Sequence, residues 1–211
     1  MSDSSSTGLL VTSQTYCTLA EVNARLGLVS TAGDAMLQQI ISAVSRWIDT
    51  YTGRRFYPAE ETRYYTADDA REIWIDDILA VTSLKTDDDA DRVYENTWSA
   101  TDYDLLPDNA QVKDLPFSRI KITPNGSRGF PTKVSKGIEL IGSYGYSEDT
   151  SNARTVMIKE ACLLQSERVW KRKDSPLGVS GMTPLGQQLL KVPGLDPDVK
   201  EMLDPFRRLV E

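Results

Sequence analysis

The chain has 211 residues, of which 40% are hydrophobic and 26% charged, and its formal net charge is −7 at pH 7. This composition is ordinary for a globular protein, and no apolar run approaches the roughly 20 residues that a membrane helix needs, so we expect no membrane contact. Histidine is absent, which removes the commonest general base and zinc ligand and lowers the expectation of an enzyme. Cys17 and Cys162 lack metal-ligand spacing, so we interpret both as small core residues and expect no cofactor.

Charge is unevenly distributed along the chain. Residues 60–110 carry fifteen Asp or Glu against four Lys or Arg, whereas residues 152–211 carry ten basic and eight acidic side chains. The two regions are therefore expected to meet different partners. Binding to nucleic acid phosphates needs clustered Lys and Arg, so we expect DNA to be met without specific binding.

The N-terminal third predicts two helices. Residues 1–15 have no basic start and predict a disordered leader, after which Thr18 and Glu21 have capping-box spacing and Gly27 supplies a stop, giving a helix over 19–26. Asp34 is the expected cap of a second helix over 34–52, which ends at Gly53. Its predicted buried face has helical spacing and consists of Leu37, Ile40, Ile41, Val44, Trp47 or Ile48, and Tyr51.

From about 62 to 146 the apolar period changes to two, which predicts an antiparallel β region. The expected strands are 63–66, 72–75, 81–86, 92–94, 103–106, 120–123 and 137–146. Residues 86–91 predict an acidic hairpin tip, and 124–131 predict a long loop.

Residues 153–172 contain neither Gly nor Pro and have apolar side chains at helical spacing, which predicts a helix capped by Asn152. Its apolar surface is wider than one partner helix would cover. The simpler interpretation is a core helix, and the second adds contact with a neighbouring subunit. The candidates for that contact are Met157, Ala161, Leu164, Arg168 and Trp170.

The C-terminal region begins with an expected extended arm over 174–195, because Gly and Pro are frequent there. Asp196 and Pro197 then start a short helix over 197–209, broken or restarted at Asp204 and Pro205. The predicted fold class is therefore α+β: a helical bundle with an inserted antiparallel β region. The expected domains are a leader (1–15), a single domain (16–173) with a β insertion at about 60–147, and an arm with a short helix (174–211).

Catalytic motifs are weak. Ser180 lies in a Gly-Val-Ser-Gly-Met sequence, but Met182 replaces the second glycine of a nucleophile elbow. Asp87, Asp89 and Asp91 have the spacing of the first calcium ligands, yet Arg92 and Trp98 occupy positions that an EF-hand reserves for Gly and Glu. A pair of carboxylates within 60–110 could still converge, which leaves a metal-dependent hydrolase as an alternative.

The order of these parts resembles the head-to-tail connector (adaptor) proteins of long-tailed bacteriophages. The resemblance extends from about residue 15 to 209. It is carried by the Thr18–Glu21 motif, the helix ending in Ile48–Phe56, the strand ending in Ile138–Tyr146, the helix closing on Trp170, and the segment Leu195–Leu209.

The resemblance implies a structural virion protein, found in the neck of the virion and in the host cytoplasm during assembly. Such proteins form a ring, commonly of twelve copies, under the portal protein. The ring extends the DNA channel and provides a platform for neck or tail-completion (stopper or tail terminator) proteins. A tail-completion or terminator protein is the alternative within the structural class.

The resemblance also suggests roles for particular residues. The C-terminal arm would reach the portal, with Leu203, Phe206 and Leu209 as apolar anchors and Arg207 and Arg208 pairing with acidic groups. The alternative is that this helix packs on its own domain. The acidic residues Asp87, Asp88, Asp89 and Asp91 would face the channel or the tail, where they would repel DNA and let it slide.

Overall fold

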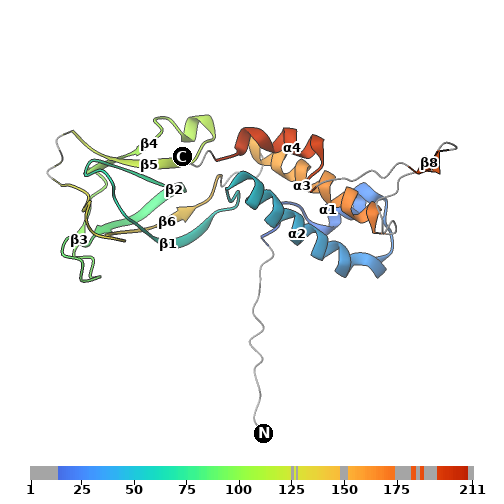
Figure 1. Ribbon diagram of the computed structural model, residues 1–211, viewed down its shortest axis with the longest axis horizontal. Helices are drawn as coiled ribbons and strands as arrows, with labels where there is room; N and C mark the ends of the chain where they lie inside the picture. The colour runs from blue at the N-terminus through green and yellow to red at the C-terminus, as the bar shows by residue number, and fades with distance from the viewer. Residues whose placement is uncertain are drawn as a thin grey trace, which may run out of the picture. The chain divides into compact units, whose positions relative to one another are not determined.

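A computed structural model describes residues 14–124, 126, 128–147, 152–173, 182–183, 186–187 and 194–208 (Figure 1). The chain divides into two compact units. The helical unit contains described residues from 14–52 and 157–207, and the sheet unit contains described residues from 53–156 together with Arg208. Helices combined with an antiparallel sheet confirm the predicted α+β class.

Helix α1 (Leu19–Leu26) has the predicted ends. The Thr18 hydroxyl accepts a hydrogen bond from the Glu21 amide, the Glu21 carboxylate accepts one from the Thr18 amide, and Gly27 adopts φ 68° as the C-cap. Both reciprocal bonds of the capping box are thus present.

Helix α2 (Asp34–Thr52) follows a single 3₁₀ turn, η1 (Thr31–Gly33), which Ser30 caps. Asp34 was predicted as a cap but is the first helical residue, because the 3₁₀ turn moves the start of the helix upstream. The large buried side chains are Leu37, Ile41, Val44 and Ile48. Trp47, an alternative to Ile48 in the predicted face, is 38% exposed.

The sheet contains six antiparallel strands in the order β1-β6-β2-β5-β4, with β3 paired to β2. Their bounds are β1 Ala59–Tyr65, β2 Glu72–Thr86, β3 Asn96–Thr97, β4 Tyr103–Leu106, β5 Phe117–Ile122 and β6 Ile138–Tyr144. The predicted strands 72–75 and 81–86 are one continuous strand, and the strand predicted at 92–94 is replaced by the shorter β3. The turn-forming aspartates before Arg92 delay the return of the chain to β2.

Strand β2 changes partners along its length. Its first half pairs with β5 and its second half with β6, with irregular register between Trp74 and Ile78 and again near Val81. Its inward side chains, including Ile73, Ile75 and Ile78, form the sheet core with residues of β5 and β6. Trp98 stacks on Phe130 beside them, with ring centroids 4.8 Å apart.

Helix α3 (Ala153–Arg172) starts as predicted, since Asn152 Oδ1 accepts hydrogen bonds of 2.9 Å from the Arg154 and Thr155 amides. Its buried residues are Ile158, Ala161, Cys162, Gln165 and Ser166. The Cys162 sulfur lies 3.2 Å from that of Cys17 in the interior of the helical unit, and both are free thiols, which fits their interpretation as core residues.

The C-terminal helix is shorter than predicted. Helix α4 (Pro197–Leu203) is followed by the 3₁₀ turn η3 (Asp204–Phe206), and Arg207 is extended with ψ 131°, so the predicted helical range to 209 was wrong. Asp196 precedes Pro197 but makes no side-chain cap, because its carboxylate pairs with Arg168. Most of the predicted arm lies outside the described residues, which include the short antiparallel pair β7 (Met182–Thr183) and β8 (Gly186–Gln187).

Candidate functional site

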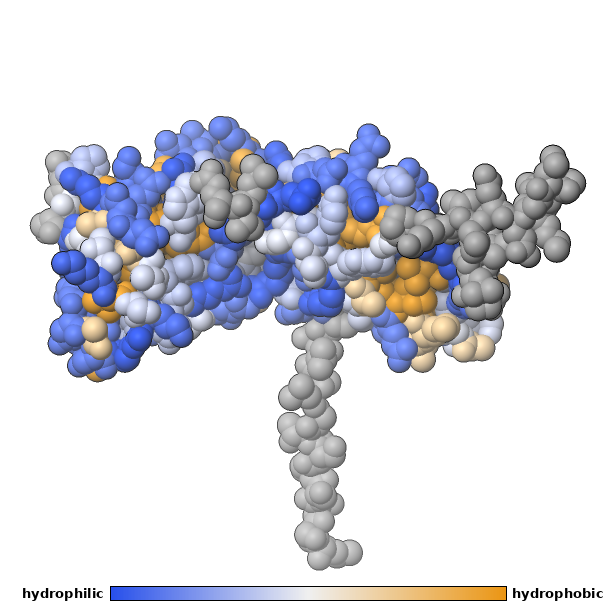
Figure 2. Space-filling model, in the orientation of Figure 1, coloured by the Kyte–Doolittle hydropathy of each residue, from blue (hydrophilic) through white to orange (hydrophobic). Residues whose placement is uncertain are grey.

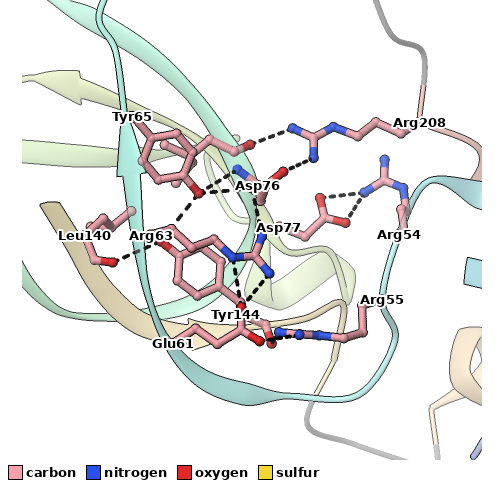
Figure 3. Close-up of polar contacts among 11 residues, drawn as sticks. Arg54, Arg55, Glu61, Arg63, Tyr65, Asp76, Asp77, Leu140, Tyr144 and Arg208 are labelled. Carbon is pink, nitrogen blue, oxygen red and sulfur yellow. Dashed lines mark hydrogen bonds and ion pairs between the residues drawn. The ribbon is translucent and has the colours of Figure 1, made fainter. Parts of the chain in front are cut away.

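A polar cluster in the sheet unit joins arginines to carboxylates of β1 and β2, beside Tyr144 at the end of β6 (Figure 3). Arg63 on β1 forms ion pairs of 2.7 Å with Glu61 and with Asp76 on β2, and its guanidinium lies 4.2 Å from the centroid of the Tyr144 ring. Arg54 binds both oxygens of Asp77, at 2.6 and 2.7 Å. We call this cluster the arginine network.

Arg208 completes the arginine network. Its Nη1 donates to Asp76 Oδ1 at 2.7 Å, and its Nη2 donates to the Ile75 carbonyl at 2.8 Å. The sequence analysis expected Arg208 to pair with acidic groups of a partner. In this structure its guanidinium binds a carboxylate of its own chain, and contact of Arg208 with the portal stays a prediction.

The carboxylates of the network differ in their environment. Burial raises the pKa of Asp76, but hydrogen bonds from Arg63 and Arg208 outweigh it and hold the pKa below its usual value. Burial dominates at Asp77 and raises its pKa despite the Arg54 pair. Glu61 is also partly buried, yet Arg55 and Arg63 lower its pKa.

The network is built to hold chain segments together. Each of its three carboxylates faces at least one guanidinium, and the cavity between them is only about 50 Å³. A cavity of that size is far below the 300–1,000 Å³ or so of a typical ligand pocket. The arrangement therefore fixes β1, β2 and Arg208, and it leaves no room for a substrate.

The acidic turn after β2 separates the four predicted channel-facing residues into two kinds. Asp87 is fully buried, and its carboxylate accepts hydrogen bonds from the Ala90 and Arg92 amides at 2.8 and 2.9 Å. Burial raises its pKa, but these amides outweigh that effect and lower it. Asp87 thus shapes the turn and cannot face a channel, because no part of it reaches solvent.

The other three aspartates of the turn, Asp88, Asp89 and Asp91, are exposed. Carboxylate oxygens of Asp87, Asp89 and Asp91 lie within 4.8 Å of one another. Asp88 accepts from Asn96 at 2.8 Å, and Asp91 accepts from the Val93 amide at 2.7 Å. Hydrogen bonds within the turn thus account for much of this grouping.

The candidate portal-binding residues differ in their exposure to solvent. Leu203 and Phe206 are buried inside the helical unit, at 0% and 4% exposure, so they fill its core and are not surface anchors here. The Tyr51 hydroxyl donates to Asp204 at 2.5 Å, which ties η3 to α2. Arg207 is exposed and lies 5.3 Å from the Tyr51 ring centroid. Leu209 lies outside the described residues.

The candidate residues for a subunit contact on α3 also differ in exposure. Ala161 is fully buried and presents no surface to a neighbour, whereas the Trp170 ring packs against Gly33 and is partly exposed. Arg168 pairs with Asp196 and, at 2.7 Å, with Asp198. Met157 is 39% exposed and Leu164 is half-buried, so both can contact another chain.

Two exposed features escaped the sequence analysis. The first is on one side of α2, where Met36 is 50% exposed and Trp47 38%. The second is Trp74 on β2, which is 66% exposed, with the Arg119 guanidinium carbon 4.7 Å from its ring centroid. The exposed apolar side of α2 could have been predicted from the sequence. Its apolar residues follow one another at helical intervals of four, three and four positions: Met36, Ile40, Ala43 and Trp47. Trp74 alternates with the buried Ile73 and Ile75, which places it on the outer face of the sheet.

The comparisons with known proteins agree with the resemblance. The model of the Phage gp6-like head-tail connector protein family matches residues 16–100. The match spans less than half of the chain, so these residues are similar to that family. The match covers α1, α2 and the sheet as far as β3, and the resemblance to head-to-tail connectors predicted from the sequence is confirmed. No curated protein matches the chain.

The fold of the chain resembles proteins in three solved structures. One structure, the neck of an empty GTA particle computed with C6 symmetry, has 19% identity, a TM-score of 0.60, and coverage of 92% of this chain and 90% of that one. A second, the neck of a native GTA particle computed with C12 symmetry, has 17% identity, a TM-score of 0.57 and coverages of 92% and 89%. A third, the virion of a native gene transfer agent (GTA) particle, has 19% identity, a TM-score of 0.51 and coverages of 92% and 90%. Along the described part of the chain, no helix combines the length and apolar character needed to span a bilayer.

Proposed function

We propose that this chain is a structural protein of the neck of a phage or phage-like particle, where copies form a ring at the head-tail junction. The observation that carries the proposal is a fold shared over 92% of this chain with a neck protein, 90% of which is covered in turn. The family match over residues 16–100 supports the same role independently.

The ring is proposed to dock on the portal protein and to offer its other face to a neck or tail-completion protein. Twelve copies are the proposed number, supported by the C12 symmetry of one similar neck. The genome would pass through the ring without specific binding, which suits a chain of net charge −7. Exposed Asp88, Asp89 and Asp91 are the residues proposed to meet DNA or the tail.

Electron microscopy of the purified protein, alone and mixed with the cognate portal ring, tests this function. A ring seated on the portal is the expected result. A particle that ignores the portal but binds the end of an isolated tail would instead identify a tail-completion protein. Charge reversal at Asp88, Asp89 and Asp91 should slow genome passage, and normal infectivity of that variant would refute the proposed contact with DNA.

Portal contact by the C-terminal segment needs a different test from truncation. Removing residues 174–211 would delete Val199, Leu203 and Phe206, which are buried, and would expose the interior of the helical unit. Arg207→Glu changes an exposed charge and leaves those core residues in place. Loss of portal binding with unchanged thermal stability would support the segment as the contact, and retained binding would exclude Arg207.

A further inference from the structure

Helix α2 carries more apolar surface than its own core uses. Its core row is Leu37, Ile41, Val44 and Ile48, and a second row, Met36, Ile40, Ala43 and Trp47, lies about 100° around the helix. We call this second set the α2 row. Met36 is 50% exposed and Trp47 38%, Ala43 is exposed, and Ile40 is half-buried. Figure 2 shows hydrophobic residues gathered over α2 in the helical unit.

A second apolar surface lies on α3. Val156 and Met157 are 45% and 39% exposed, and the half-buried Leu164 lies seven residues after Met157, two turns along the same side. We call these three residues the α3 patch. Among the α-helices of the described residues, large apolar side chains are exposed only in the α2 row and the α3 patch.

Two different apolar surfaces suit a ring. Each copy in a cyclic ring of more than two gives one surface to the neighbour on one side and a different surface to the neighbour on the other. Contacts between permanently associated copies are also more apolar than transient ones. The α2 row and the α3 patch meet both conditions.

The sheet unit is a poorer choice for contact between copies. Its most exposed aromatic residue, Trp74, lines a hollow with Asp68, Asp69 and Glu72. An apolar contact made through Trp74 would also remove these carboxylates from water, which is costly for charged groups. The α2 row and the α3 patch consist of apolar side chains.

We infer that the α2 row of one copy docks on the α3 patch of the next copy. The inference rests on the proposed ring and adds which surfaces close it. Trp47 is the expected centre of the contact, because buried Trp side chains dominate many interfaces.

Cross-linking in the assembled ring tests the pairing directly. Ala43→Cys and Met157→Cys introduce exposed thiols, whereas Cys17 and Cys162 are buried and leave the wild-type protein unreactive. A short bis-maleimide should convert rings of the double variant into a ladder of covalent oligomers. Each single variant should stay monomeric on a denaturing gel, and an equal mixture of the two single variants should stop at dimers.

Other patterns overturn the inference. Dimers from Ala43→Cys alone would mean that the α2 row contacts itself, and a double variant without a ladder in rings seen by microscopy would place the contact elsewhere. If the wild-type protein forms no ring on the portal, the proposed function fails as well, and microscopy distinguishes this case from the others.

Substitution gives a second, independent measurement. Met36→Asp and Trp47→Asp should each weaken ring formation ~10-fold or more, because a polar group would be buried in an apolar contact. Trp74→Asp is the matched control, since it removes a more exposed tryptophan from the sheet unit. Far-ultraviolet circular dichroism verifies folding. Rings of wild-type stability from folded Met36→Asp protein would overturn the inference.

Discussion

Arg208 Nη1 lies 2.7 Å from Asp76 Oδ1, while the adjacent Arg207 is exposed and pairs with no carboxylate in the contacts of the described chain. Two neighbouring arginines of identical chemistry therefore have different surroundings. Arg208 is part of the arginine network, and Arg207 is available to other molecules.

Arg208→Ala should lower the free energy of unfolding by up to about 1 kcal/mol, because the Arg208 and Asp76 side chains are 30% and 42% exposed and solvent screens their attraction. Arg207→Ala is the matched control and should change stability less. Urea denaturation of both variants measures the difference. Equal effects of the two substitutions would contradict the assigned role of Arg208.

The Asp76 pKa predicts a pH dependence of stability. Since Arg63 and Arg208 lower the pKa in the folded state, the stabilisation is fully present above the unfolded value of about 3.9 and is lost as pH falls through the folded value. Asp76→Asn should therefore be less stable than wild type at pH 7, and the gap should narrow towards pH 3. A constant gap across this range would show that the charge of Asp76 is not responsible.

Gly142 in β6 should tolerate no side chain. A Cβ there would lie 2.3 Å from the Ala80 carbonyl oxygen and 2.8 Å from Ile78 Cδ1. Gly142→Ala should therefore lower stability by roughly 1–3 kcal/mol, the usual range for overpacking. Gly129→Ala is the control, because its nearest neighbour would be 3.8 Å away. Thermal unfolding of the two variants should differ clearly, and a stable Gly142→Ala protein would mean that β2 and β6 separate easily.

Both thiols should resist modification in the folded protein. Cys17 and Cys162 are 3% and 0% exposed, and the hydrogen bond with Cys162, followed by burial, raises the pKa of the Cys17 thiol. A thiol reagent should label neither cysteine in buffer and both in denaturant. Rapid labelling of either one in the native protein would contradict the buried pair.

Asp87→Ala should destabilise the acidic turn, since two backbone amides would lose their acceptor. Asp89→Ala removes an exposed carboxylate and should have a smaller effect on the thermal midpoint. The same assay with Mg²⁺, Ca²⁺ and Mn²⁺ tests the alternative of a metal-dependent hydrolase. Because a bound ion stabilises the folded state by mass action, a concentration-dependent rise in the midpoint that Asp89→Ala abolishes would favour that alternative.

Local signals predicted the helices well. The starts of α1 and α3 follow from Thr18, Glu21 and Asn152, which bond to backbone amides within their own turn, so the neighbouring sequence determines them. Strand ends in the sheet depend on partners far along the chain. The sequence between 75 and 81 does not reveal that β2 continues while it changes from β5 to β6.

The candidate site residues were harder to predict because exposure is decided by packing between distant segments. Leu203 and Phe206 have the spacing of apolar anchors, but spacing does not say whether a helix turns that face to its own unit or to a partner. Arg208 and Asp76 are 132 positions apart, so their pairing leaves no local pattern. The residues of the α2 row are also spaced as one side of a helix. The predicted buried face of this helix included Ile40 and Trp47 together with the core residues, so the row was not recognised as a separate surface.

The interleaving of the two units affects how the protein folds during synthesis. Cys17 and Cys162 pack together from positions 145 apart, and the sheet unit occupies most of the chain between them. At roughly 5–20 residues per second, a ribosome needs about 5 to 20 s to make the roughly 100 residues that separate α2 from the buried part of α3. The newly made α1 and α2 therefore wait with an uncovered apolar face while the sheet, almost continuous in sequence, can fold first. During this interval the nascent chain is at its most vulnerable to aggregation, and chaperone binding is expected at α2.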